Sequence, residues 1–191
     1  CLGLLSALTG AWTGLNQTQL RKIMAASSIA HMGWVVTAMT MQLNLAMVVL
    51  IVYIIATTAI FTVLIPTATK TLQDMATVWT LTPPLLTAAL LTIMSLGGLP
   101  PLTGFTPKWF ILKELSTLHL TPFSTALALI GLPSLYFYIR ITFISTLTMS
   151  PGTTNTEQNW RFQLQYHMIM PLTLMLSMTL LPLVPLMYFM N

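Results

Sequence analysis

Charged side chains are almost missing from this sequence of 191 residues. Lys and Arg contribute 7 and Asp and Glu contribute 3, which together make 5% of the chain, against about 25% in an average soluble protein. The surface of a soluble domain is about 25–35% charged, and this chain cannot supply such a surface. The shortage excludes a soluble enzyme, a nucleic-acid-binding protein and a disordered tail. It leaves an α-helical membrane protein, whose outer surface faces lipid.

Cysteine is also nearly absent, because Cys1 is the one cysteine in the sequence. This excludes an internal disulfide, a cysteine-based zinc site and an iron–sulfur cluster. The sequence has no Walker lysine loop, no GxGxxG motif and no cluster of metal ligands, so we expect no cofactor on this chain. Cys1 starts the chain within an apolar run, which we interpret as the carboxy-terminal part of a longer protein.

Apolar runs with the length of a membrane span, about 20 residues, recur along the whole chain. They predict one all-α membrane domain over 1–191, a transmembrane bundle of about six spans of which the first is partial. One of the runs stops at Pro66. The predicted spans are residues 1–13, 23–41, 43–65, 84–117, 123–148 and 168–190.

The segment 84–117 is too long for one straight span. As a continuous helix it would measure about 50 Å, whereas the hydrocarbon core of a bilayer is about 30 Å thick. It contains six helix-breaking residues: Gly97, Gly98, Pro100, Pro101, Gly104 and Pro107. We therefore predict two half-helices joined by an unwound stretch. Such a stretch must be covered by protein or line a water-filled cavity, so this segment should be central in the bundle.

The distribution of basic residues predicts the orientation of the bundle. If the broken segment crosses the membrane once, the loops at 14–22, 66–83 and 149–167 share one side. The basic residues of these loops are Arg21, Lys22, Lys70 and Arg161. Loops rich in Lys and Arg mark the cytoplasmic side. We expect these three loops on the cytoplasmic or matrix side.

Lys108 follows the predicted break and lies beside Trp109. A lysine at the centre of a bilayer costs at least about 2.5–3.5 kcal/mol, so its presence needs a reason. One interpretation is an amine that carries protons, because broken helices hold ion sites in transporters. The alternative is a structural lysine, either bound by the carbonyls of the broken helix or extended to the membrane interface. The coincidence of break and charge favours the first interpretation.

His31 is the titratable group of the span 23–41. Ser27 and Ser28 precede it by four and three residues, so the three side chains share one face of the helix. We expect this face to point into the bundle. A histidine there is a candidate proton relay, and the alternative is a neutral histidine hydrogen-bonded to a neighbouring helix.

Glu114 lies next to Lys113 near the end of the second predicted half-helix. One interpretation is a pair of solvated charges at the membrane interface. The other is that the Glu114 carboxylate influences the buried amine of Lys108.

Two stretches of sequence resemble one family closely. They are GLNQTQLRKIMAASSIAHMGW at 14–34 and SLGGLPPLTGFTPKW at 95–109. Both resemble the mitochondrially encoded chain 2 family of NADH–ubiquinone oxidoreductase, the antiporter-like membrane subunits of respiratory complex I. The resemblance extends through the whole chain in order and spacing.

The resemblance implies a proton-translocating module in the mitochondrial inner membrane, with the basic loops in the matrix. In the family pattern, Lys108 matches a lysine on the second discontinuous helix and His31 matches a histidine of the proton path. The family places NADH, FMN, the iron–sulfur clusters and ubiquinone on partner subunits. The expected partners are the other membrane subunits of complex I and the lipid bilayer, without nucleic acid. Two alternatives stay open: a stand-alone cation/proton antiporter and a purely structural membrane subunit.

Overall fold

The computed structural model describes residues 1–148 and 169–179, except the side chains at positions 77 and 79–81. This described part is all-α, as predicted, and it contains eight helices and no strand. The helices are α1 (Leu2–Gly14), α2 (Leu20–Met39), α3 (Leu43–Thr67), α4 (Leu72–Leu81), α5 (Pro83–Gly97), α6 (Phe105–Thr117), α7 (Thr121–Leu147) and α8 (Ile169–Thr179). The predicted loop 149–167 lies outside the described residues, as do residues 168 and 180–190 of the last predicted span.

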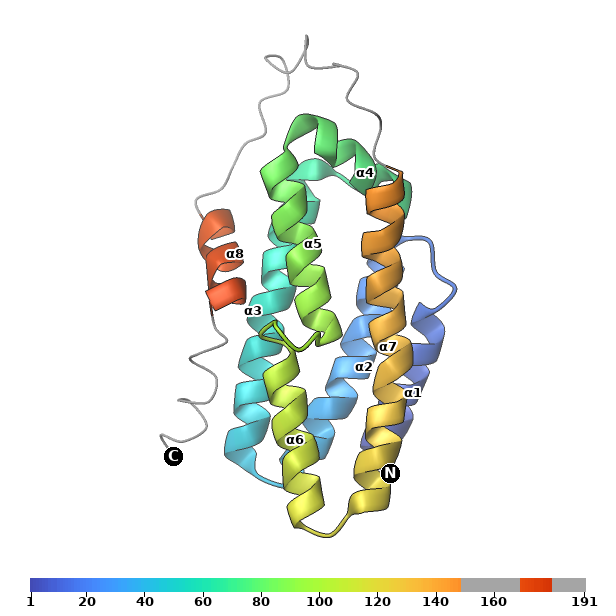
Figure 1. Cartoon of the computed structure of the whole chain (residues 1–191), viewed down its shortest axis with the longest axis vertical. Coiled ribbons are helices and arrows are strands. Elements are labelled where there is room, and N and C mark those ends of the chain that lie inside the picture. The colour runs from blue at the N-terminus through green and yellow to red at the C-terminus, as the bar shows by residue number, and fades with distance from the viewer. Residues whose placement is uncertain (149–168, 180–191) are drawn as a thin grey trace.

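The long helices lie side by side along the long axis of the molecule (Figure 1). Their direction alternates along the chain, except that α6 continues in the direction of α5. Helix α4 lies across one end of this bundle, which we call the α4 end. The connections around 15–19 and 68–71 are both at the α4 end and pair with each other, because the Leu20 N–H donates to the Lys70 carbonyl at 3.1 Å. The connections at 40–42 and 118–120 lie at the opposite end.

Two of the described helices, α3 and α7, are long and apolar enough to cross a membrane. Helix α3 does not stop before Pro66, as the sequence had suggested, but continues to Thr67. A proline removes one backbone donor, and here the loss falls in the last turn of the helix. The chain then leaves α3 through Ala68, which has a left-handed φ of 50°.

The core between the helices is made mainly of large apolar side chains, whereas α1 and α2 approach each other closely through small residues. Gly10 of α1 lies so close to α2 that an added Cβ would be 2.4 Å from the backbone nitrogen of Ala30. At the α4 end, Arg140 of α7 donates a hydrogen bond to the carbonyl of Leu15. A cation at the carbonyl end of a helix is favourable, so this contact fixes the end of α1 against α7.

Helix α4 was not predicted, because its residues were assigned to the loop 66–83. Its start is a capping box, in which the Asp74 N–H donates to the Thr71 hydroxyl at 3.3 Å and the Thr71 N–H donates to the Asp74 carboxylate at 2.8 Å. The Lys70 N–H donates to the same carboxylate at 3.1 Å. The spacing of Thr71 and Asp74 was a sequence signal for a helix start that the span analysis passed over.

Replacing Asp74 by Ala is expected to speed amide hydrogen exchange in the first turn of α4 several-fold, since the box loses its acceptor. The hydrogen bond from the Thr71 N–H holds the pKa of Asp74 below its ordinary value, which is about 3.9. The ionised Asp74 carboxylate therefore stabilises the start of α4 fully at pH values above the ordinary pKa. This stabilisation is lost as the pH falls through the lowered pKa of the folded state. Exchange corrected for its intrinsic rate should not change from about pH 5 to 8. A wild-type protection that declines over this range would contradict the assignment.

Candidate functional site

The break between α5 and α6 lies at about half the height of the bundle (Figure 1). Helix α5 has 15 residues and α6 has 13, so they measure about 22 Å and 20 Å. Together they are about as long as α7, with its 27 residues. Between them the chain makes turns in which the Leu102 N–H donates to Leu99 and the Phe105 N–H donates to Leu102. The break therefore places irregular backbone deep in the bundle.

The glycines and prolines of the break have different roles. Gly98 ends α5 with a φ of 86°, a left-handed conformation that favours glycine. At Gly104 an added Cβ would lie 1.9 Å from the carbonyl oxygen of Ser95, so no other residue fits there without movement. Pro107 is buried in the first turn of α6, where a missing backbone donor is tolerated.

The remaining three residues of the predicted break flank these positions. Gly97 is the buried last residue of α5, and an added Cβ there would lie 3.4 Å from Tyr138. Pro100 and Pro101 are exposed in the turns between the two helices. All six predicted break residues thus lie at or beside the junction of α5 and α6.

Buried hydroxyl groups form hydrogen bonds that join the break to the end of α5 and to α8. The Thr103 hydroxyl donates to the carbonyl of Ser177 in α8 at 2.9 Å, and it lies 2.7 Å from the Ser95 hydroxyl. The Gly104 N–H donates to the same Ser95 hydroxyl at 3.3 Å. Because a carbonyl can only accept, the Thr103 proton is committed to Ser177, and the proton between the hydroxyls belongs to Ser95. Sequence analysis did not single out Ser95 and Thr103, although Ser95 precedes the Gly/Pro stretch and Thr103 lies within it.

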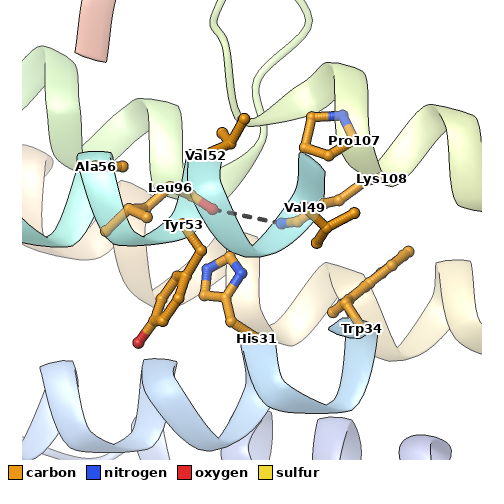
Figure 2. A pocket seen from close by; sticks show the side chains of 10 residues that line it. His31, Trp34, Val49, Val52, Tyr53, Ala56, Leu96, Pro107 and Lys108 are labelled. Atoms are coloured by element: carbon orange, nitrogen blue, oxygen red, sulfur yellow. Dashed lines mark hydrogen bonds between the residues drawn. The ribbon is translucent and has the colours of Figure 1, made fainter. Parts of the chain in front are cut away.

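Lys108 extends back across the break to the carbonyl end of α5. Its Nζ donates to the carbonyl of Gly97 at 2.9 Å and to that of Leu96 at 3.4 Å, and the latter bond is drawn in Figure 2. The amine lies 5.8 Å from the centre of the Trp34 ring, within the range of a cation–π interaction. Lys108 therefore binds the carbonyls of the broken helix and does not extend to either end of the bundle.

His31 lies on α2 between two tyrosines. Its Nε2 is 3.3 Å from the hydroxyl of Tyr138 on α7, and its ring centre is 4.9 Å from that of Tyr53 on α3. The hydroxyls of Ser27 and Ser28 donate to carbonyls of their own helix, each at 2.7 Å. Ser27 also lies next to Tyr138, and Ser28 next to Tyr53. The histidine is thus hydrogen-bonded to a neighbouring helix, by a tyrosine that the sequence analysis did not single out.

A small cavity joins Lys108 to His31. It has a volume of about 20 Å³ and is also lined by Trp34, Tyr53 and Gly104. Figure 2 shows the lysine and the histidine entering it from opposite sides, one from α6 and the other from α2. A water molecule needs about 10–15 Å³ of such space and at least two polar partners. The cavity therefore has room for one water between the two titratable side chains.

Glu114 lies away from this cavity. Its carboxylate accepts a hydrogen bond from the Gln42 side chain at 2.9 Å, which joins the end of α6 to the connection between α2 and α3. Lys113 beside it is exposed. Glu114 and Lys108 are six residues apart on α6, so they lie on different faces of the helix. In the described residues, Glu114 forms no ion pair with Lys108, and no group of acidic, histidine or cysteine residues is suited to a metal ion.

Comparison with known proteins places this arrangement in a family. Residues 1–133 match the family described as NADH:quinone oxidoreductase/Mrp antiporter, transmembrane. The chain belongs to this family. Residues 135–188 match the family described as NADH dehydrogenase subunit 2 C-terminus. The two matches together cover nearly the whole chain and agree with the resemblance carried by the stretches at 14–34 and 95–109.

Its relatives are named NADH-ubiquinone oxidoreductase chain 2, which confirms that resemblance. The chain is 47% identical to the Xenopus laevis protein over 97% of its own length, and 44% identical to the Bos taurus protein over 96%. These alignments cover 54% and 53% of the relatives, so the chain spans about half the length of the curated relatives it matches.

Two solved structures resemble the fold. A chain of respiratory complex I from Thermus thermophilus, determined with bound aureothin, superposes with a TM-score of 0.72 at 25% identity, over 95% of this chain and 44% of that one. A chain of the Mrp complex from Dietzia sp. gives a TM-score of 0.64 at 17% identity, over 73% of this chain and 28% of that one. The second likeness is one of fold alone.

Proposed function

We propose that this chain carries protons across the mitochondrial inner membrane as a core membrane subunit of respiratory complex I. The observation that carries the proposal is the amine of Lys108, held at a helix break and joined to His31 by a cavity with room for one water. A buried titratable group at irregular backbone is a typical ion site in membrane transporters. The relatives named chain 2 support the assignment to complex I.

In the proposed mechanism, Lys108 stores a proton and His31 relays it. As an ammonium group, Lys108 is stabilised by the two carbonyls at the end of α5. It gives a proton to the water of the cavity, and that water gives one to a nitrogen of the His31 ring. The Tyr138 hydroxyl, on the other side of His31, is the next group that can exchange a proton. No step requires a redox group on this chain.

The proposal includes the cofactors and the partners of the assembled enzyme. NADH, FMN, the iron–sulfur clusters and ubiquinone would be bound by partner subunits, which oxidise NADH and reduce ubiquinone. The other membrane subunits of complex I and the lipid bilayer would surround this chain. Its contribution would be proton transfer driven by the redox reaction elsewhere in the complex.

The proposed topology has six crossings, with α5 and α6 counted as one, and the α4 end in the matrix. Alternation of the helices between the two ends supports it (Figure 1). Arg21, Lys22 and Lys70 all lie in connections or first turns at the α4 end. The connections at the opposite end, 40–42 and 118–120, contain neither Lys nor Arg.

Replacing His31 by Gln in the assembled enzyme is expected to lower the rate of proton translocation several-fold. The Gln side chain can bond to the Tyr138 hydroxyl but cannot exchange a proton at neutral pH. Protons per electron are measured in proteoliposomes with a pH-sensitive dye and NADH oxidation. His119→Asn is the matched control, because His119 lies exposed at the opposite end with a left-handed φ of 60°, which Asn tolerates. An unchanged stoichiometry in the His31 variant would reject the relay.

The second candidate function is a stand-alone cation/proton antiporter, favoured by the family description matched by residues 1–133, which includes the Mrp antiporter. The full-length protein without partners in liposomes separates the two functions. Proton movement driven by a sodium gradient would support the antiporter, and its absence is expected for a subunit of complex I.

A further inference from the structure

A groove opens on the outside of the bundle at the α4 end, separate from the cavity between Lys108 and His31. Its volume is about 240 Å³, and residues from the start of α2, the end of α3 and the connection 68–71 line it. The charged residues of the lining are Arg21 and Lys70. They come from segments about fifty residues apart that the pairing of Leu20 with Lys70 brings together.

In the part of the chain that the structure describes, cations outnumber acidic residues around this groove. The segments 15–22 and 68–74, which comprise the two connections and the helix starts that follow them, contain the cations Arg21, Lys22 and Lys70 and one acidic residue, Asp74, so their net charge is +2. Asp74 interacts with the Lys70 charge, but its carboxylate already accepts hydrogen bonds from the backbone N–H groups of Lys70 and Thr71. The groove is therefore complementary to an anion.

The end of α2 adds to the positive potential. The helix begins at Leu20 without a side-chain cap and without an acidic residue in its first turn. The amino-terminal end of a helix carries partial positive charge, and cations such as Arg21 are disfavoured there. An anion in the groove would relieve this repulsion.

The opposite wall of the groove is apolar and continues along the outside of α3. Phe61 and Ile65, one turn apart, are 43% and 74% exposed. Ile54, seven residues before Phe61 in the sequence, lies on the same face of α3 and is 47% exposed. From Ile65 to Ile54 the helix rises about 16 Å, which is about half of the hydrocarbon core of roughly 30 Å. The exposed strip thus has the length of one lipid leaflet.

We propose that this groove binds one anionic phospholipid. Its phosphate lies between Arg21 and Lys70, and one acyl chain follows Phe61, Ile65 and Ile54. The head group requires a negative charge, because a choline group would meet the cations of the groove. This site extends the proposed function and requires only that α3 crosses the membrane, without any proton transfer at Lys108.

The experiment uses the assembled complex that contains the full-length protein, reconstituted in nanodiscs. The probe is phosphatidylglycerol with a photoreactive diazirine on one acyl chain, diluted in phosphatidylcholine. After irradiation, peptide mass spectrometry is expected to find the label on residues 54–65. The double variant Arg21→Gln, Lys70→Gln should lower the labelling about tenfold or more, since each cation near a membrane surface contributes about 1 kcal/mol to the binding of an anionic lipid. Lys22→Gln is the matched control, because Lys22 is exposed at the same helix end but does not line the groove.

Several results would overturn the proposal. Equal labelling by the phosphatidylcholine analogue would mean that the acyl chain alone is recognised. Loss of labelling in inorganic phosphate at constant ionic strength would mean a site for a free anion. A crosslink from these residues to another subunit would mean that protein covers the groove. If the double variant does not assemble, each single variant must lower the labelling, and NADH oxidation in them should stay normal.

Discussion

Replacing Lys108 by Met is expected to abolish the proton transfer that this chain contributes to the assembled enzyme. Met has a similar length and fits the apolar part of the site, but it has no proton to store and no donor for the carbonyls of Leu96 and Gly97. Loss of a positioned acid–base group typically costs about 10²–10⁴-fold in rate. The measurement is the number of protons translocated per electron in proteoliposomes, with assembly checked on a native gel.

Lys108→Arg separates proton storage from structure. Arginine keeps the positive charge and the donors at the carbonyl end of α5, but it does not release its proton in proteins. We expect this variant to assemble and still fail to translocate. Normal translocation in the Arg variant, with failure in the Met variant, would show that Lys108 serves as a structural cap. A normal proton-to-electron ratio in both would reject any role for the residue.

The substitution with the largest expected structural effect is Gly104→Ala. The added Cβ would be 1.9 Å from the carbonyl oxygen of Ser95, a backbone atom that moves only if α5 and α6 separate. Overpacking of a core typically costs about 1–3 kcal/mol and occasionally more. We expect poor assembly, or a complex that loses NADH oxidation at a clearly lower temperature than the wild type.

Gly131→Ala is the control for this effect. An added Cβ at Gly131, inside α7, would meet the Trp34 ring at 3.5 Å, an ordinary contact. In the interior of a helix, Ala is favoured over Gly by about 1 kcal/mol. The variant should be at least as stable as the wild type. Equal stability of the Gly104 and Gly131 variants would contradict the close packing at the break.

The sequence indicated candidate site residues where placing a residue type in a membrane costs much free energy. Lys108, His31 and the Gly/Pro stretch stood out because charge and missing backbone donors are expensive in an apolar environment. The all-α fold could be predicted for the same reason, because a helix satisfies its own backbone hydrogen bonds in an apolar environment. The sequence allowed the Lys108 amine either to bind the carbonyls of the broken helix or to extend to the membrane interface. It could not decide between them, because the contact with α5 depends on how the chain folds between Gly98 and Gly104.

Other parts of the site depend on contacts between distant helices. Tyr53 and Tyr138 are ordinary members of apolar spans, and only the packing of α3 and α7 against α2 brings them to His31. Ser27 and Ser28 use their hydroxyl donors within their own helix, as is common for serine. The partner of Glu114, Gln42, lies 72 positions away in the sequence.

The buried row from Gly104 through Ser95 and Thr103 to Ser177 has a fixed polarity. It starts at an amide that can only donate and ends at a carbonyl that can only accept. A proton wire works by inverting each of its links in turn, and here neither terminus permits inversion. The row therefore cannot conduct protons along itself, although it lies beside the break and consists of polar groups.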